Sequence, residues 1–459
     1  MAARKPSSQA GLPASIDLDG KKIAARRGQA LAAALLEAGV RIFSRSVKYH
    51  RPRGPFCFAG RCSHCLMRVN GVPNVATCRA TVEDSCRVSV QNVMGSAKLD
   101  VLGSIDWLFP RGLDHHEMFA GVPVVEKAVA VVARHLAGLG KLPDSAAGPL
   151  APAESLHPDA VVVGAGPAGI AFAQAATAPG RNVVLVDEEA EPGGLAGAIR
   201  TPEEKATFNV AVAGLRREGC DLRLSTSVVG HYRDDRGRFL AAITSKPQPR
   251  VLKIYFRALG LCTGGQEPLW AFPGNDLPGV YAGRGLARFA GREQFACGEE
   301  TLVVARHSDA TEIIRALESA GAKVSGLVQL ANGRSDRATA GHFEVIRAEA
   351  LDSARGSGRV EKLVLLADGR KRAVACDAAV LCGPISPAFE LASEAGCEID
   401  PHQASGGFKV RVDSSGATTM AGVFAAGHAC GAEGIGDAWK QGRTAGEAAA
   451  AFLGAGGSR

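Results

Sequence analysis

Four cysteines near the N-terminus constrain this chain more than any other feature of its sequence. Their spacing is C-x4-C-x2-C-x12-C, and they are Cys57, Cys62, Cys65 and Cys78. Plant-type 2Fe–2S clusters use C-x4-C-x2-C followed by a distant fourth cysteine. Gly60 and Gly71 suit a loop whose backbone passes close to sulfur without a Cβ in the way. A disulfide pair or a zinc ribbon is the alternative, but zinc ribbons usually show two C-x2-C pairs and this chain has one.

The segment around the cysteines has the pattern of a ferredoxin-like domain. Residues 14–42 predict a strand, a turn at Asp19–Gly20, a second strand and a helix that ends at Gly39. A hairpin and a helix followed by a cysteine loop favour a β-grasp fold, which we expect to span residues 1–98. Residues 99–157 are predicted to be a helical connector and a linker, because their last part is rich in Pro, Ala, Gly and Ser.

A new domain begins with a glycine-rich turn. Residues 159–194 predict strand, turn, helix and strand, with G-x-G-x-x-G at Gly164, Gly166 and Gly169. In such a turn the first glycine permits the tight bend, the second lets the backbone approach a pyrophosphate, and the third lets the helix pack on the strand. The helix N-terminus then faces the phosphates with the positive end of its dipole. The segment therefore predicts a dinucleotide site.

Residues further along the chain complete this predicted site. Asp187 stands where an acid binds ribose hydroxyls, and Pro167 with Gly193–Gly194 favours FAD over NAD. Residues 259–265 predict a strand that runs into a Thr-Gly turn. Residues 422–446 resemble the last flavin-binding segment of flavoproteins with two dinucleotide-binding domains, in which an Asp normally follows Ala-Gly. His428 takes the place of that Asp here.

A second Rossmann-like unit lies between these segments. Residues 301–330 again predict strand, turn, helix and strand, but the turn at residues 305–310 has no glycine. Because Cβ atoms there would obstruct a pyrophosphate, we expect the architecture of an NAD(P)-binding domain without its usual nucleotide. The predicted boundaries are 158–270 and 374–459 for the two parts of an FAD-binding domain, and 271–373 for the NAD(P)-like domain.

Charge and cysteine content narrow the class of protein. The net charge of +7 comes mainly from residues 1–60, which hold eleven Lys or Arg and three Asp or Glu. No nucleic-acid-binding motif accompanies this excess, so we expect a solvated face or a docking surface. The sequence contains no run of 18 apolar residues, so it predicts no membrane-spanning helix. Because the first 25 residues lack the apolar stretch of a secretion signal, twelve cysteines predict cluster ligands and buried thiols in a reducing cytoplasm.

The order of these motifs resembles the alpha subunits of sarcosine-oxidase-type amine dehydrogenases, with opine oxidase, proline or hydroxyproline dehydrogenase and hydrogen cyanide synthase as relatives. The motifs that carry the resemblance are FSRSVKYHRPRG with PFCFAGRCSHC, GAGPAG with LVDEEAEPGG, WAFPGNDLPGVY and GVFAAGHACG. They occur in family order, and the resemblance extends over nearly the whole chain, from about residue 15 to about residue 455. The resemblance implies an α/β and α+β chain, in which a β-grasp ferredoxin-like domain precedes a flavoprotein with two Rossmann-like dinucleotide-binding domains.

The resemblance also implies cofactors and partners. A separate beta-type subunit with its own FAD would oxidise a secondary amine, further small subunits can accompany it, and FMN can lie at the interface. Electrons would pass through flavin to the cluster of this chain and to an external acceptor, with no catalytic residue here. By position the cluster ligands would be Cys57, Cys62, Cys65 and Cys78, with Cys86 as the less favoured substitute for Cys78.

The dinucleotide, FAD or an unreactive NAD in the same site, would be contacted by residues of the two glycine-rich segments and their neighbours. The candidates are Gly164, Gly166, Pro167, Ala168, Gly169, Asp187, Glu188, Gly194, Val228, Thr263, Gly264, Gly427 and His428. Two other functions compete with that of an electron-transfer subunit. One is a stand-alone NAD(P)H-dependent ferredoxin-type flavin reductase, against which the glycine-free second turn speaks. The other is a non-catalytic scaffold with a structural cluster.

Overall fold

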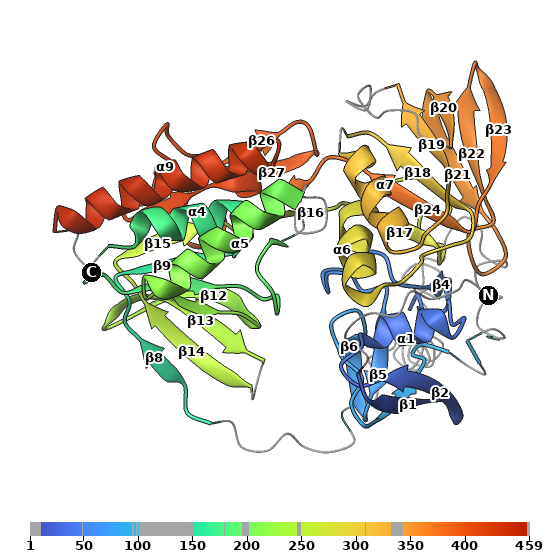
Figure 1. Ribbon diagram of the computed structural model, residues 1–459, viewed down its shortest axis with the longest axis horizontal. Coiled ribbons are helices and arrows are strands. Elements are labelled where there is room, and N and C mark those ends of the chain that lie inside the picture. Colours follow the sequence, from blue (N-terminus) through green and yellow to red (C-terminus); the bar gives the residue numbers. More distant parts are fainter. Residues whose placement is uncertain are drawn as a thin grey trace, which may run out of the picture. The chain divides into compact units, whose positions relative to one another are not determined.

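The computed structural model of the chain describes residues 11–47, 49–93, 96–97, 100, 143, 151–178, 180–194, 202–245, 249–307, 309–331 and 343–456. The chain folds into two compact units, each built from two separate stretches of sequence (Figure 1). Unit 1 comprises residues 1–146 and 269–383, and unit 2 comprises residues 147–268 and 384–459.

The first part of unit 1 is the predicted ferredoxin-like domain. Its five-stranded sheet has the order β2-β1-β7-β5-β6, in which β1 pairs in parallel with β7 and the other pairs are antiparallel. The elements are β1 (Pro13–Leu18), β2 (Lys21–Arg26), α1 (Leu31–Glu37), β3 (Ser44–Arg45), β4 (Pro52–Arg53), β5 (Leu66–Val69), β6 (Val72–Ala76) and β7 (Ser85–Ser89).

Local sequence explains the start of this domain. Asp19 and Gly20 both have positive φ, 48° and 87°, as the tight turn of a β-hairpin requires. Helix α1 buries all of its apolar residues, from Leu31 to Leu36, and ends before Gly39, whose φ is 81°. The expected hairpin and helix are therefore confirmed.

The second part of unit 1 is a Rossmann-like domain. Its parallel sheet has the order β17-β24-β18-β19-β20, and an antiparallel sheet of three strands follows β20. The elements are β17 (Val280–Ala282), α6 (Gly283–Glu293), β18 (Thr301–Ala305), α7 (Ala310–Ser319), β19 (Val324–Leu330), β20 (Glu344–Ala348), β21 (Ala350–Arg355), β22 (Lys362–Ala367), β23 (Arg370–Ala375) and β24 (Ala378–Cys382).

Unit 2 contains the other Rossmann-like domain, with a parallel sheet of the order β11-β10-β9-β15-β28 and a second sheet of the order β12-β13-β14-β8. Its elements up to residue 266 are β8 (Glu154–Leu156), β9 (Ala160–Val163), α4 (Pro167–Ala176), β10 (Val183–Val186), α5 (Pro202–Arg217), β11 (Asp221–Arg223), β12 (Thr226–Asp234), β13 (Gly237–Thr244), β14 (Arg250–Tyr255), β15 (Ala258–Leu261) and β16 (Gly265–Gln266). The rest are β25 (Ser386–Pro387), α8 (Glu390–Glu394), β26 (Ile399–His402), β27 (Gly407–Val410), β28 (Val423–Ala425), the 3-10 helix η3 (Gly427–Cys430) and α9 (Ile435–Gly454).

The core of unit 2 lies on both faces of its parallel sheet. Alternate residues of β9 point to opposite faces, so Val162 packs in the cluster that includes helices α4 and α9, whereas Val161 and Val163 pack against the second sheet. Because both faces are covered, the strand is a continuous apolar run.

Two expected boundaries are corrected. Strand β24 lies between β17 and β18, so the Rossmann-like domain of unit 1 extends to Gly383 and does not end at residue 373. Residues 154–156, expected in the linker, form strand β8, which pairs with β14. Most of the predicted helical connector, at residues 101–142, lies outside the described residues.

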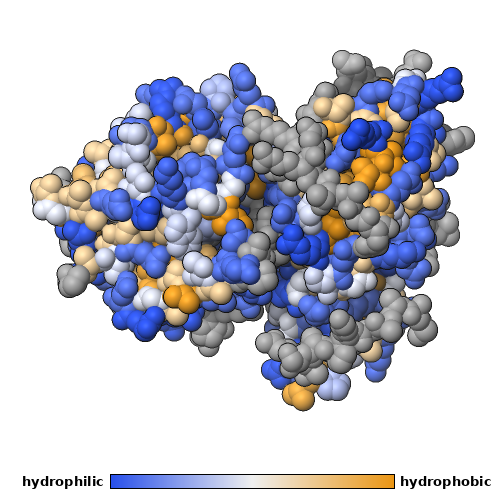
Figure 2. All heavy atoms as spheres, turned by 45° about the horizontal axis from the view of Figure 1, so that its top comes forward, coloured by the Kyte–Doolittle hydropathy of each residue, from blue (hydrophilic) through white to orange (hydrophobic). Residues whose placement is uncertain are grey.

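Hydrophilic side chains cover much of the coloured surface in Figure 2, with hydrophobic patches between them. Across the described ranges, none of the helices combines the length and the apolar character that crossing a membrane requires.

Candidate functional site

The fold brings the four motif cysteines together in the ferredoxin-like domain. Cys57, Cys62 and Cys65 lie in the loop between β4 and β5, and Cys78 follows β6. Thr77 joins the two segments, because its hydroxyl and its backbone N–H both donate to the carbonyl oxygen of Cys65, at 2.8 and 3.3 Å. Cys65 and Cys78 are each 1% exposed, whereas Cys57 and Cys62 are half-buried.

The thiols form two pairs. A hydrogen bond with Cys62 lowers the pKa of Cys57 to about 6 and raises the pKa of Cys62. In the same way a hydrogen bond between Cys65 and Cys78 lowers the pKa of Cys65 and raises that of Cys78. In each pair one thiol therefore has a lowered pKa, and the thiolate is the form of cysteine that binds metal.

The pairing of the thiols, Cys57 with Cys62 and Cys65 with Cys78, can be compared with the ligand sets of two kinds of metal centre. A zinc ribbon needs four ligands around one ion, whereas a 2Fe–2S cluster takes two protein ligands on each iron. The residues present thus fit the two-iron group.

Backbone geometry in the cysteine loop supports the same conclusion. The N–H of Ala59 donates to the Sγ of Cys57 at 3.4 Å, and the N–H groups of Arg61 and Cys62 also lower the pKa of Cys57. The direction of these N–H groups depends on left-handed backbone, with φ of 50° at Phe58 and 73° at Gly60. N–H groups directed at cluster sulfurs are among the features that set a cluster's potential.

Two expectations about neighbouring residues change. Gly71 lies in the turn between β5 and β6, with φ of 81°, so it serves that hairpin and not the cysteine loop. Cys86 is 2% exposed in β7, where its sulfur accepts the N–H of Glu83 at 3.3 Å. The thiol that pairs with Cys65 is Cys78, so the structure favours Cys78 over Cys86 as fourth ligand.

The glycine-rich turn of unit 2 has the geometry of a dinucleotide site. Gly164 has φ of 103°, and a Cβ on it would lie 2.2 Å from the carbonyl oxygen of Cys262. A Cβ on Gly169 would lie 1.7 Å from the carbonyl oxygen of Gly164. A Cβ on Gly166, the N-cap of α4, would meet no atom within 4 Å. The protein thus leaves open space where a pyrophosphate would meet the helix N-terminus.

Asp187, the acidic residue that follows β10, holds the backbone of this turn in place through hydrogen bonds. The carboxylate of Asp187 accepts the N–H of Ala165 at 2.5 Å and the N–H of Glu189 at 2.8 Å. Burial raises the pKa of Asp187 in spite of these two donors. Gly194, with φ of 58°, comes close to the turn, since its Cβ would lie 3.6 Å from the Cα of Gly166. Glu188 follows Asp187 and is half-buried.

The remaining candidates lie at different distances from this turn. A Cβ on Gly427 would lie 2.8 Å from the Cβ of Ala168, so η3, with the half-buried His428, lies against the first turn of α4. The hydroxyl of Thr263 donates to the carbonyl oxygen of Ala388 at 2.7 Å. Gly264 has φ of 71° and open space beside it. Val228 packs against the core at a β-bulge of β12.

Sequence reasoning missed the glycines of α9. A Cβ on Gly442 would lie 2.1 Å from the carbonyl oxygen of Ala168, and a Cβ on Gly446 would lie 2.4 Å from that of Phe172. These two glycines, four residues apart on one helix face, let α9 approach α4 closely. The i, i+4 spacing of glycines in an alanine-rich helix was the available signal.

The glycine-free turn in unit 1 is occupied by the chain's own charges. Arg284 is 2% exposed, and its Nε lies 2.5 Å from a carboxylate oxygen of Asp309, the N-cap of α7. Arg284 also donates to the carbonyl oxygen of Gly383 at 2.8 Å, and His307 Nδ1 lies 2.9 Å from the other oxygen of Asp309. A carboxylate thus lies at the helix end where a nucleotide phosphate would bind.

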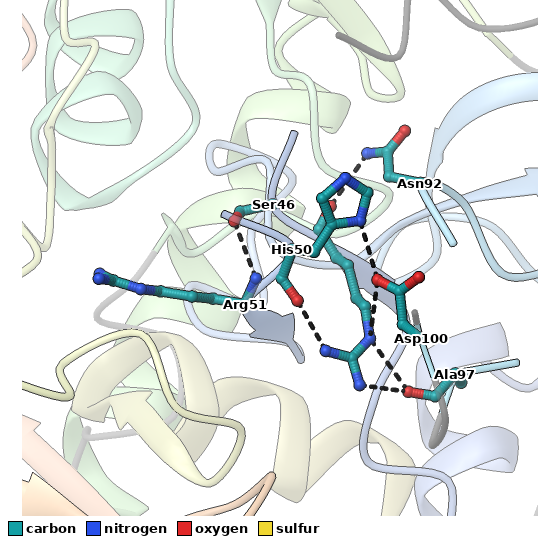
Figure 3. A network of polar contacts seen from close by, with 7 residues as sticks. Ser46, His50, Arg51, Asn92, Ala97 and Asp100 are labelled. Atoms are coloured by element: carbon teal, nitrogen blue, oxygen red, sulfur yellow. Dashed lines mark hydrogen bonds and ion pairs between the residues drawn. The ribbon is translucent and has the colours of Figure 1, made fainter. Parts of the chain in front are cut away.

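The basic segment before the cysteines is anchored by a buried carboxylate (Figure 3). His50 Nδ1 lies 2.8 Å from Asp100 Oδ2, and Arg45 Nε lies 3.7 Å from the same atom. The guanidinium of Arg45 also donates to the carbonyl oxygens of His50 and Ala97, at 2.6 and 2.8 Å. The hairpin β3–β4 is thereby tied to Ala97 and Asp100, while Arg51 is exposed.

Comparisons with known proteins agree with both sites. The family "2Fe-2S iron-sulfur cluster binding domain" matches residues 13–93, and the family "NAD(P)-binding Rossmann-like domain" matches residues 162–219. The chain therefore has an N-terminal 2Fe–2S ferredoxin-like domain followed by a Rossmann-like dinucleotide-binding domain.

Relatives match over most of the chain. The alpha subunit of sarcosine oxidase from Rhizobium meliloti is 28% identical over 84% of this chain and 41% of its own length. A subunit of opine oxidase from Agrobacterium tumefaciens is 25% identical over 64% of this chain and 66% of its own length. The chain thus spans about two fifths of the sarcosine oxidase subunit that it matches.

Two solved structures share the fold. L-proline dehydrogenase from P. horikoshii has a TM-score of 0.72 at 18% identity and covers all of this chain, with 77% of its own chain covered. T. acidophilum thioredoxin reductase has a TM-score of 0.51 at 15% identity, covering 66% of this chain and 99% of its own. The Rossmann-like part of the chain therefore has the architecture of thioredoxin-reductase-type flavoproteins.

Proposed function

We propose that this chain, which resembles the alpha subunits of sarcosine and opine oxidases, is the electron-transferring subunit of a heteromeric flavin-dependent amine or imino-acid dehydrogenase or oxidase. The substrate class is sarcosine, proline, hydroxyproline or an opine. A beta-type subunit with its own FAD oxidises the amine, and this chain passes the electrons on to an external acceptor.

One observation carries the proposal: two thiol pairs suited to a 2Fe–2S cluster occur in the same chain as an open dinucleotide turn. A flavin exchanges two electrons with an amine and one at a time with a cluster, so the two groups together convert hydride chemistry into single-electron transfer. Cys57, Cys62, Cys65 and Cys78 would hold the cluster. The residues around Gly166 would hold FAD or NAD, and FMN would lie at the partner interface.

The chain's own residues have supporting roles in this proposal. The N–H groups of the cysteine loop would stabilise charge on the cluster sulfurs. Asp187 holds Ala165 so that the turn keeps its open shape. The exposed basic residues beside the cysteines, of which Arg51 is one, would form part of a docking surface for a protein partner.

The Arg284–Asp309 ion pair favours this function over a stand-alone NAD(P)H-dependent reductase. Such a reductase needs a nicotinamide nucleotide at the second Rossmann-like turn. The carboxylate of Asp309 already lies at that helix end, so a phosphate there would meet negative charge.

Co-expression with a beta-type amine-oxidising subunit tests the proposal. The complex is purified without oxygen, and sarcosine, proline, hydroxyproline or an opine is added while flavin absorbance and the electron paramagnetic resonance of the cluster are followed. We expect substrate to reduce both groups. Flavin that is fully reduced beside a cluster that stays oxidised would contradict the electron path, and failure to form a complex would contradict the subunit role.

A further inference from the structure

The Phe58 side chain connects the cysteine loop to the Rossmann-like domain of unit 1. Phe58 lies between Cys57 and Cys62 in the sequence and is 2% exposed. Its ring centroid lies 4.7 Å from that of Phe289 on α6 and 5.5 Å from that of Tyr281 on β17. The loop that bears three of the four cysteines is thus anchored in an aromatic site made by another domain of the same unit.

Neighbouring residues join the same two surfaces. The N–H of Ala282, the N-cap of α6, donates to the carbonyl oxygen of Phe56 at 3.0 Å. A guanidinium nitrogen of Arg53 lies 3.5 Å from Asp276. Phe56 belongs to the core of the Rossmann-like domain, and Cys57 and Cys62 pack against that core. The cysteine loop therefore packs on this domain through three consecutive residues, Phe56, Cys57 and Phe58.

The backbone of Phe58 needs this support. Its φ of 50° lies in the left-handed region, which a non-glycine residue with a large side chain rarely adopts. Such a conformation persists only where surrounding contacts hold it. The aromatic contacts of Phe58 supply that hold, and the loop then keeps the N–H of Ala59 directed at Cys57.

Helix α6 connects this anchor with the occupied nucleotide turn. Phe289 lies on the helix and Ala282 caps it, while Arg284 in its first turn pairs with Asp309. The ion pair fixes the start of the helix that carries the aromatic site. The ion pair between Arg284 and Asp309 leaves no place for a phosphate. It thus also stabilises α6, the helix that supports the cysteine loop.

We propose that the Rossmann-like domain of unit 1 serves as a scaffold for the iron–sulfur cluster in place of nucleotide binding, with Phe58 as the positioning residue that anchors the cysteine loop. This inference rests on the proposed function only in that the four cysteines hold a cluster. It assigns the domain a role that does not depend on which amine is oxidised.

The full chain, isolated without oxygen, tests the proposal with two substitutions at one position. Phe58→Asn removes the ring but suits left-handed backbone, since asparagine adopts it more readily than most residues. Phe58→Leu keeps an apolar side chain without the aromatic contacts. The control Leu317→Ala opens a cavity in the core of the same domain, at a fully buried residue of α7, with the cysteine loop unchanged.

The readouts are the half-life of the visible absorbance in excess iron chelator, the resonance line shape of the reduced cluster and its midpoint potential. We expect Phe58→Asn to lose the cluster about 10- to 100-fold faster than the parent chain, as for other residues that orient metal ligands, with a broadened signal and a shifted potential. Phe58→Leu should show the same changes to a smaller extent. Leu317→Ala should keep the parent signal and potential.

Three results would overturn the proposal, and they are distinguishable. Parent-like half-life and potential in both Phe58 variants would mean that the ring does not position the loop. Equal cluster loss in Leu317→Ala would mean that any destabilisation of the domain has this effect. A parent chain prepared without oxygen that contains no iron would remove the cluster itself, and with it the proposed function.

Discussion

The guanidinium of Arg284 and the carboxylate of Asp309 form an ion pair, 2.5 Å from Nε to oxygen, at the first turn of α7. In nucleotide-binding Rossmann domains this helix end receives a phosphate. Here the chain supplies both the anion and its counter-charge. In the Rossmann-like domain of unit 1, the charges at this helix end are therefore balanced without a nucleotide.

We predict that neither NADH nor NADPH reduces the chain or binds to the domain of unit 1. The carboxylate of Asp309 would repel a phosphate at the helix end, and Arg284 is already paired. Anaerobic titration with each nucleotide should leave flavin and cluster absorbance unchanged. Bleaching by either nucleotide would restore the reductase function.

Because of the same ion pair, the free energy of unfolding should decrease as the pH falls. Burial alone would raise the pKa of Asp309, but the hydrogen bond with His307 and the charge of Arg284 outweigh burial and lower it. A lowered pKa contributes stability that is present above the unfolded value of about 3.9 and is lost as pH falls through the folded value. Denaturant titrations should show that the parent loses more stability than Asp309→Asn between about pH 6 and about pH 3. Equal losses would contradict this role.

Two alanine substitutions in the glycine-rich turn should separate folding from binding. A Cβ at position 166 meets no protein atom within 4 Å, so Gly166→Ala should keep the melting temperature but lose bound dinucleotide. A Cβ at position 169 would lie 1.7 Å from a carbonyl oxygen, so Gly169→Ala should also lower the melting temperature. Thermal unfolding together with nucleotide released on denaturation tests both. Full dinucleotide content in Gly166→Ala would place the ligand elsewhere.

Cysteine substitutions should identify the fourth ligand. Cys78→Ser should reduce bound iron from about two ions per chain to nearly none, because each iron of a 2Fe–2S cluster needs both of its cysteines. Cys86→Ser should keep the iron, since Cys86 lies in β7 and accepts a hydrogen bond from Glu83. Iron analysis and visible absorbance distinguish the two. The reverse pattern would exchange their roles.

The basic segment offers a matched pair of substitutions. Asp100→Ala should lower the unfolding free energy by about 3–5 kcal/mol, because Arg45 and His50 lose a buried charge partner. Arg51→Ala removes an exposed cation and should change stability by less than about 0.5 kcal/mol. Under the proposed docking role, Arg51→Ala should instead slow association with the beta-type partner, an effect that added salt should reduce. Equal stability of the two variants would contradict the anchoring role of Asp100.

Sequence predicted most closely where local geometry allows few residue types. The turn at Asp19–Gly20 needs positive φ, and the bend at Gly164 needs both positive φ and the absence of a Cβ. The spacing of Cys57, Cys62 and Cys65 likewise indicated one loop. The expectation that Gly71 serves that loop is wrong, because a hairpin turn makes the same demand on backbone conformation as a cluster loop does.

Long-range contacts account for what was missed. Strand β24 is a short apolar run like its neighbours, and only its pairing with β17 and β18 shows which sheet it joins. Arg284 and Asp309 lie 25 positions apart in the sequence, and neither belongs to a recognisable motif. Their pairing depends on the packing of α6 beside α7.

The sequence alone determined the types of site, since thiolates at cluster spacing and glycines at a phosphate turn are required by the size and charge of what they hold. Only the tertiary structure decided which thiols pair, which helix end is already neutralised, and which domain supports the cysteine loop through Phe58. The physical reason is that bond geometry acts between neighbours along the chain, whereas packing and charge neutralisation act between surfaces that folding brings together.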